Sequence, residues 1–148
     1  GIQDRFRIEL KKINGNEKTK IIYQSNGFID YLSETKKWII WSEQNFQKTR
    51  VCAVKKSDLQ QNNYSIKKHL ICPFENLLPR SVSIISSPTN EDPKGNLNEN
   101  IWVRIHEERL NGDYYSLIKW NPNSNSSKKL EFDRFTNPIR VVNAGKDL

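Results

Sequence analysis

Apolar and polar residues alternate along much of this chain, in short runs bounded by turn-forming residues. Near the N-terminus Phe6, Ile8 and Leu10 alternate with charged residues, which is the period of a strand with one buried face. Val103 and Ile105 alternate with Arg104 and His106 in the same way. Other short runs are rich in β-branched and aromatic residues, at 38–41, 50–55, 82–85, 130–135 and 139–143. The pattern predicts about eight or nine short strands.

Three Asn-Gly dipeptides lie between such runs, at residues 14–15, 26–27 and 111–112. This dipeptide tolerates the positive φ angles of a two-residue hairpin turn, so each one predicts a hairpin. A turn at 26–27 would set Tyr23 opposite Asp30, so we expect a bulge or a longer loop there. A turn at 14–15 places three pairs on one face, with Leu10 opposite Thr19, Ile8 opposite Ile21 and Phe6 opposite Tyr23.

The hairpin predicted around residues 111–112 has a consistent register. On one face Arg104 lies opposite Lys119, and like charges across two strands are destabilising. A bound anion or an acidic partner would relieve that repulsion, and so would splaying of both side chains into water. The other face holds two apolar pairs, Ile105 with Ile118 and Val103 with Trp120.

Helical signals are short, at residues 65–71 and 74–78, and two polar stretches, 86–100 and 121–129, are predicted to be surface loops. We therefore expect an all-β fold, an antiparallel sandwich or a partly closed barrel built from hairpins, with at most one or two short helices. The 148 residues suit a single domain, 1–148. Because the chain begins with Gly and contains no Met, we expect it to be a segment of a larger protein.

The net charge is +7, and the whole excess lies in the first 70 residues, which carry 14 basic and 7 acidic side chains. Such a surface attracts anionic partners. The sequence contains no apolar run long enough to span a membrane and no recognisable signal peptide. Cys52 and Cys72 are too few for a disulfide framework, so we expect free thiols in an intracellular protein, nuclear or cytoplasmic. Whether these two cysteines pair stays open.

Groups suited to acid–base catalysis are few. Of the two histidines, His69 and His106, neither lies in a nucleophile motif, and only Glu108 is placed to orient His106. Glu9 and Lys11 have the E-x-K spacing of metal-dependent nuclease strands, but an exposed charged strand face explains them equally well. The glycines are too dispersed for a phosphate-binding loop. We expect no enzymatic activity.

The sequence offers one candidate metal centre, a zinc site. His69 and Cys72 have H-x-x-C spacing, and Cys52 could be a third ligand. A structural zinc ion takes four protein ligands, and no fourth lies nearby in the sequence. We expect neither a metal nor a cofactor.

Nucleic-acid binding is one candidate function. Lysine doublets lie at predicted strand ends and loops, near aromatic residues. Small β-barrels of the oligonucleotide-binding type bind single strands by stacking bases on aromatic rings while basic groups neutralise phosphates. This alternative assigns a nucleic acid or another polyanion to Lys11, Lys12, Lys55, Lys56, Tyr31, Lys67 and Lys68.

A protein-interaction module is the favoured interpretation. The run from Trp38 to Trp41 directs one Trp and one Ile to each face of a strand, so one pair needs cover from a loop of the chain or from a partner. We expect a non-catalytic scaffold domain of a larger intracellular assembly. Its basic and aromatic surface would bind a protein partner through Trp38, Trp41, Lys36, Lys37, Arg104 and Lys119.

Overall fold

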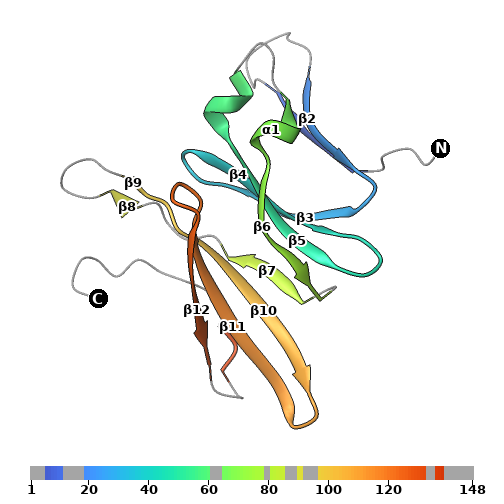
Figure 1. Ribbon diagram of the computed structural model, residues 1–148, viewed down its shortest axis with the longest axis vertical. Coiled ribbons are helices and arrows are strands. Elements are labelled where there is room, and N and C mark those ends of the chain that lie inside the picture. Colours follow the sequence, from blue (N-terminus) through green and yellow to red (C-terminus); the bar gives the residue numbers. More distant parts are fainter. Residues whose placement is uncertain are drawn as a thin grey trace.

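The structure, a computed structural model, describes residues 6–11, 19–60, 65–78, 81–85, 90–91, 97–132 and 136–138. Its strands form antiparallel sheets that do not close into a barrel (Figure 1). The all-β prediction is confirmed, and of the two expected architectures the open sandwich is the one adopted. Within the described part of the chain no helix is long and apolar enough to cross a membrane.

A four-stranded sheet, here called the central sheet, lies between two hydrophobic cores. Its strand order is β3-β4-β5-β6, and the strands are β3 (Phe28–Glu34), β4 (Trp38–Gln44), β5 (Thr49–Lys55) and β6 (Ile71–Leu77). Strands β4 and β5 are buried along most of their length on both faces. Such two-sided burial requires a layer on each side of the sheet.

One covering layer is a second four-stranded sheet, here called the outer sheet, with strand order β12-β11-β10-β7. It consists of β7 (Val82–Ile85), β10 (Ile101–Arg109), β11 (Gly112–Asn121) and β12 (Ser126–Glu131). The core between the central and outer sheets contains Trp38, Ile40, Val51, Ala53, Val82, Ile101, Val103, Ile118 and Trp120. Figure 1 shows the outer sheet at one end of the molecule, with β7 next to the central sheet.

The opposite face of the central sheet is covered by the N-terminal part of the chain. Strands β1 (Phe6–Leu10) and β2 (Lys20–Ser25) pair with each other, and η1 (Lys56–Gln60) and α1 (Ile66–His69) follow β5. This second core contains Ile8, Ile22, Tyr23, Trp41, Cys52, Val54 and Leu59. A short additional pair, β8 (Asn90–Glu91) with β9 (Leu97–Asn98), lies in the stretch predicted to be a loop.

Two predicted hairpin registers are wrong. In β10–β11 Arg109 pairs with Gly112, so the turn is Leu110 and Asn111, and every partner shifts by two residues from the prediction. Gly112 follows the turn with a φ of 134° instead of lying within it. Arg104 therefore stands opposite Leu117 and not opposite Lys119. The predicted like-charge pair does not exist.

In the N-terminal pair Ile8 lies opposite Tyr23 and Phe6 opposite Ser25, with a register shift after Ile8. The observed register therefore differs from the predicted one, in which Ile8 pairs with Ile21. The predicted turn at 14–15 lies outside the described residues. Residues 26–27 do not form a hairpin, because β2 and β3 belong to different sheets and the bend between them carries the chain from one sheet to the next.

Three element predictions also need revision. Residues 74–78 are predicted to be helical, but 74–77 lie in strand β6, where they pair with β5. The stretch 121–129 is a short turn followed by the start of β12, because the chain reverses within residues 122–125. The strand predicted at 130–135 corresponds to β12, which begins earlier, at Ser126, and ends at Glu131. The strand predicted at 139–143 lies outside the described residues. The short helix predicted at 65–71 is confirmed in part, because α1 is a single turn and Ile71 already belongs to β6.

Cys52 and Cys72 form a disulfide between the neighbouring strands β5 and β6. The expectation of free thiols is therefore wrong. The bridge links residues 20 apart in sequence and lies in the core beside the N-terminal pair. Disulfides persist mainly in oxidising compartments, so the bridge gives no support to the intracellular location, which stays a prediction.

Candidate interaction surface

The two tryptophans expected to contact a partner are buried within the chain itself. Trp38 packs in the core under the outer sheet, and Trp41 packs in the core under the N-terminal pair. The indole Nε1 of Trp38 donates to Oδ1 of Asn123 at 3.0 Å, so the β11–β12 turn covers it. Neither ring is available as a surface contact. Both faces of strand β4 are covered by other layers of the same chain.

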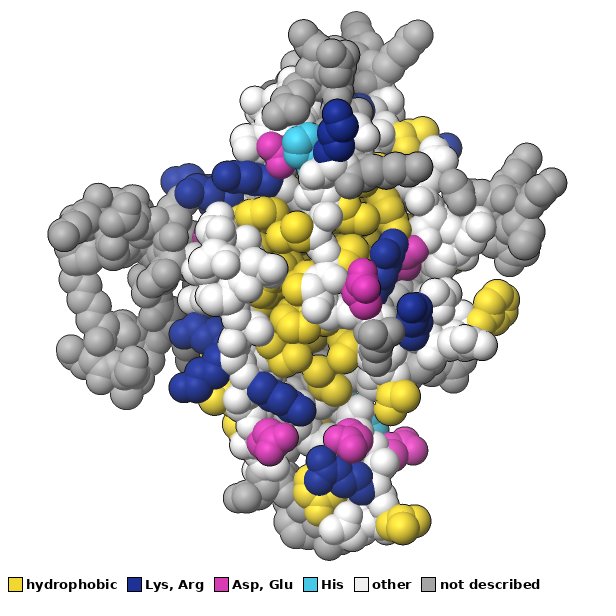
Figure 2. Space-filling model, in the orientation of Figure 1, with side chains coloured by type: hydrophobic (Ala, Val, Ile, Leu, Met, Phe, Trp, Pro, Cys, Tyr) yellow, Lys and Arg dark blue, Asp and Glu magenta, His cyan; other side chains and the backbone are white. Residues whose placement is uncertain are grey.

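Four lysines predicted to bind partners meet at one end of the central sheet. Lys36 and Lys37 form the β3–β4 turn, and Lys55 and Lys56 lie where β5 passes into η1. The backbone N–H of Lys56 donates to the carbonyl of Lys37 at 2.7 Å, which ties the two segments together. We call these four residues the lysine cluster. Figure 2 shows Lys and Arg side chains gathered beside the β3–β4 turn.

The backbone around the lysine cluster is fixed by hydrogen bonds. Thr35 exchanges two of them with Trp38, which closes the β3–β4 turn at 2.9 and 3.0 Å. The N–H of Lys37 donates to Oε1 of Glu99 at 3.0 Å, and the side chain of Glu99 is buried. A buried carboxylate thus anchors the turn from below, while Lys36 and Lys37 stay exposed. The backbone that carries the four lysines is therefore held in one arrangement.

One lysine of the cluster forms an ion pair. Glu34 pairs with Lys56 at 2.7 Å, and the Glu34 side chain is largely exposed. Among the described residues no ion pair is recorded for the other three lysines of the cluster. The cluster therefore keeps a positive charge, which attracts an anionic partner.

Arg104 and Lys119 lie on the outer sheet, apart from the lysine cluster. Arg104 donates to Ser83 Oγ at 3.1 Å and to Asn137 Oδ1 at 3.0 Å, so its guanidinium is engaged within the chain. The ammonium of Lys119 lies 5.7 Å from the centre of the Trp102 ring. Lys119 also stands opposite Lys128 on β12. Lys119 and Lys128 therefore form a pair of like charges across two strands of this sheet.

The remaining residues assigned to nucleic acid are dispersed. Lys11 follows β1, Lys68 lies in α1 and Tyr31 lies in β3. Lys12 and the side chain of Lys67 lie outside the described residues. The structure therefore brings Lys55 and Lys56 to Lys36 and Lys37, but it shows no continuous track with Tyr31.

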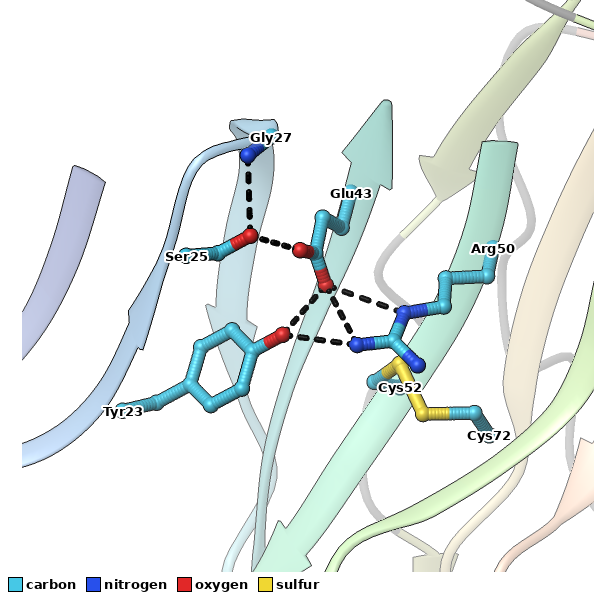
Figure 3. Close-up of polar contacts among 7 residues, drawn as sticks. All are labelled: Tyr23, Ser25, Gly27, Glu43, Arg50, Cys52 and Cys72. Atoms are coloured by element: carbon cyan, nitrogen blue, oxygen red, sulfur yellow. Dashed lines mark hydrogen bonds and ion pairs between the residues drawn. A yellow bond between two sulfur atoms is a disulfide. The ribbon is translucent and has the colours of Figure 1, made fainter. Parts of the chain in front are cut away.

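A buried polar network that sequence reasoning missed joins the N-terminal pair to the central sheet (Figure 3). Glu43 accepts a hydrogen bond from Tyr23 at 2.5 Å and another from Ser25. Arg50 pairs with Glu43 at 2.9 Å and donates to the Tyr23 hydroxyl at 2.7 Å. A Cβ on Gly27 would lie 2.9 Å from Glu43 Cγ, so only glycine allows this close approach.

The network changes the ionisation of its members. Burial raises the pKa of the Tyr23 hydroxyl, and the Glu43 carboxylate raises it further, against the opposing effect of Arg50. Burial lowers the pKa of Arg50, but its attraction to Glu43 and its hydrogen bonds outweigh this, so the net pKa is raised. These shifts favour the neutral Tyr23 hydroxyl and the charged Arg50 guanidinium. The arrangement is a clamp between two layers.

Each histidine contacts an aspartate. His69 Nδ1 lies 3.2 Å from Asp58, and His106 Nε2 lies 3.1 Å from Asp113 across the β10–β11 hairpin. Glu108 joins His106 and Asp113 in an exposed group whose ligand atoms lie within 4.8 Å of one another. The sequence suggested Glu108 and missed Asp113, because the predicted register placed it wrongly. The sulfurs of the disulfide cannot act as the thiolates that the considered zinc site needs.

No protein-family model matches the chain, and no curated protein or solved structure is significantly similar to it.

Proposed function

We propose that this domain is a non-catalytic interaction module that binds an acidic segment of a protein partner through the lysine cluster. The observation that carries the proposal is that two segments carrying Lys36, Lys37, Lys55 and Lys56 are tied together by backbone hydrogen bonds, while Glu34 pairs with Lys56 alone. A localised group of cations steers an anionic partner and favours one orientation of it.

The surroundings of the lysine cluster favour a polypeptide over a single-stranded nucleic acid. Tight binding of single strands uses exposed aromatic rings on which bases stack. Trp38, the aromatic residue next to the cluster, is buried and hydrogen-bonded to Asn123. Lysine ammonium groups without a stacking platform can still bind the carboxylates of an acidic peptide as flexible point charges.

The test compares two charge-reversed variants that have the same net charge. The first carries Lys36→Glu and Lys37→Glu in the cluster. The control carries Lys48→Glu and Lys128→Glu, two exposed lysines in the β4–β5 turn and in β12. Binding of a fluorescent Glu- and Asp-rich peptide is measured by anisotropy at low and at physiological salt. We expect the cluster variant to bind at least about tenfold more weakly than the control.

Two outcomes would overturn the proposal. Equal weakening in both variants would show that only the net charge matters. Tighter binding of an oligothymidylate of matched charge, with affinity falling steeply as salt rises, would assign the cluster to nucleic acid instead.

A further inference from the structure

A cavity separate from the lysine cluster opens between the two sheets. It has a volume of about 440 Å³, and its walls come from β3, β4 and β5 of the central sheet and from Val82 of β7. This volume falls within the range of small-molecule sites. The cavity lies on the same face of the central sheet as the core residues Val51 and Ala53, beyond the apolar packing.

Two partly exposed aromatic rings line the cavity. Phe28 and Tyr31 are 50% and 42% exposed. Phe28 is held by an edge-to-face contact with Phe6, whose ring centre lies 5.2 Å away. The hydroxyl of Tyr31 accepts a hydrogen bond from Ser83 on β7 at 3.2 Å, which bridges the two sheets at the cavity. Both rings are therefore positioned by residues that do not themselves line the cavity.

The backbone at Tyr31 is strained. Its φ is 51°, in the left-handed region that a residue with a large side chain rarely adopts, and it lies within the register shift between Asp30 and Ser33. Such conformations cost free energy and concentrate at ligand sites. The Tyr31 N–H donates to Oδ1 of Asp30 at 2.8 Å, which holds the strained residue beside the cavity.

Polar groups lie beside the rings on two neighbouring strands. Gln44 pairs with Phe28 on one side and with Thr49 on the other, so the three form one row across the sheet. Thr49 is 3% exposed, and among the described residues its hydroxyl has no hydrogen-bond partner. A buried hydroxyl without a partner is costly, and a ligand that bonds to it would remove that cost.

We propose that this cavity binds a neutral, hydroxyl-rich molecule the size of a sugar ring. The apolar face of such a ring packs on Phe28 and Tyr31. Its hydroxyls donate to Asp30 and both donate to and accept from Gln44 and Thr49. An ammonium ligand would use the rings and Asp30 but would leave the donors of Gln44 and Thr49 unpaired. The mixture of donors and acceptors therefore selects hydroxyl groups.

The test uses ligand-observed saturation-transfer NMR with a panel of free glucose, galactose, mannose and N-acetylglucosamine at millimolar concentration. The key variant is Thr49→Val, which removes the hydroxyl and keeps the shape of the side chain. We expect it to melt at the same or a higher temperature than the parent, because the unpaired hydroxyl is lost. We expect its affinity for the sugar that binds the parent to fall about tenfold.

Thr19→Val is the matched control, because it makes the same change at an exposed position that does not line the cavity. A second variant, Phe28→Ala, tests the aromatic wall and should abolish the saturation transfer. The proposal is overturned if no sugar of the panel gives a signal with the parent, or if Thr49→Val binds as the parent does. Binding of tetramethylammonium with loss in Asp30→Asn would also overturn it, because the site would then select a cation.

Discussion

Glu43 stands directly opposite Arg50 across strands β4 and β5, and the two side chains meet at 2.9 Å beneath the N-terminal pair. The pair extends to Tyr23 on β2, whose hydroxyl donates to Glu43 and accepts from Arg50. A charge pair within one sheet thus becomes an attachment point for a second layer.

Replacement of Glu43 should test this attachment. Glu43→Gln keeps the size of the side chain but removes the charge that Arg50 and Tyr23 face, so we expect a loss of about 2 kcal/mol in the free energy of unfolding. The matched control is Glu34→Gln, which breaks the exposed pair with Lys56 and should cost less than about 1 kcal/mol. Urea denaturation of both variants measures the difference, and equal losses would contradict the clamp.

The raised pKa of Tyr23 predicts a dependence of stability on alkaline pH. A folded-state pKa above the unfolded value of 10.0 gives stability that is fully present below pH 10.0 and is lost as the pH rises through the folded pKa. Tyr23→Phe lacks this titration. The stability difference between the parent and Tyr23→Phe should therefore be constant from neutral pH to about pH 9 and narrow above pH 10. A difference that widens with pH would show the opposite shift.

The disulfide predicts a redox-dependent stability. Closing the loop between Cys52 and Cys72 restricts the unfolded chain, and for a separation of 20 residues we expect about 3 kcal/mol of stabilisation. The double variant Cys52→Ala with Cys72→Ala should lose this amount and should no longer respond to a reducing agent. Thermal melts with and without dithiothreitol check both points. A parent protein that melts identically in both conditions would contradict the bridge.

Trp38 should behave as a core residue. Trp38→Ala removes a ring that is 7% exposed and packed between two sheets, so we expect a loss of about 3–5 kcal/mol in the free energy of unfolding. Any fraction that stays folded should bind the acidic peptide with unchanged affinity, because the lysine cluster remains. Denaturation and anisotropy on the same sample separate the two effects. Unchanged stability with lost binding would restore Trp38 as a contact residue.

The fold class was predictable because alternation with a period of two is a local signal. Strand β7 was located correctly at 82–85, and β4 and β5 begin or end within a few residues of their predictions. The β10–β11 register was predicted wrongly, because the chain turns at Leu110 and Asn111. A shift of two residues keeps every side chain on the same face of the sheet, so both registers satisfy the alternation. Alternation alone cannot distinguish registers that differ by two.

The candidate site was predictable only in part. The lysine doublets are visible in the sequence, but their meeting depends on the pairing of β4 with β5, which sets Trp38 opposite Lys55. The same pairing creates the contact between Glu43 and Arg50. The sequence did contain a signal for the β4–β5 hairpin in Asn45. Its side chain accepts hydrogen bonds from the N–H groups of Gln47 and Lys48, which stabilise the turn. The burial of both tryptophans depends on a third layer, which no local pattern reveals.

The most direct test of the lysine cluster is a titration of the isotope-labelled domain with the Glu- and Asp-rich peptide, followed by amide chemical shifts. We predict that the largest shifts occur in two segments, at residues 35–38 and 55–57, because the N–H of Lys56 links them. The shifts should saturate with one peptide per domain. Largest shifts on the outer sheet around Arg104 and Lys119, or small shifts spread over all exposed lysines, would contradict the account.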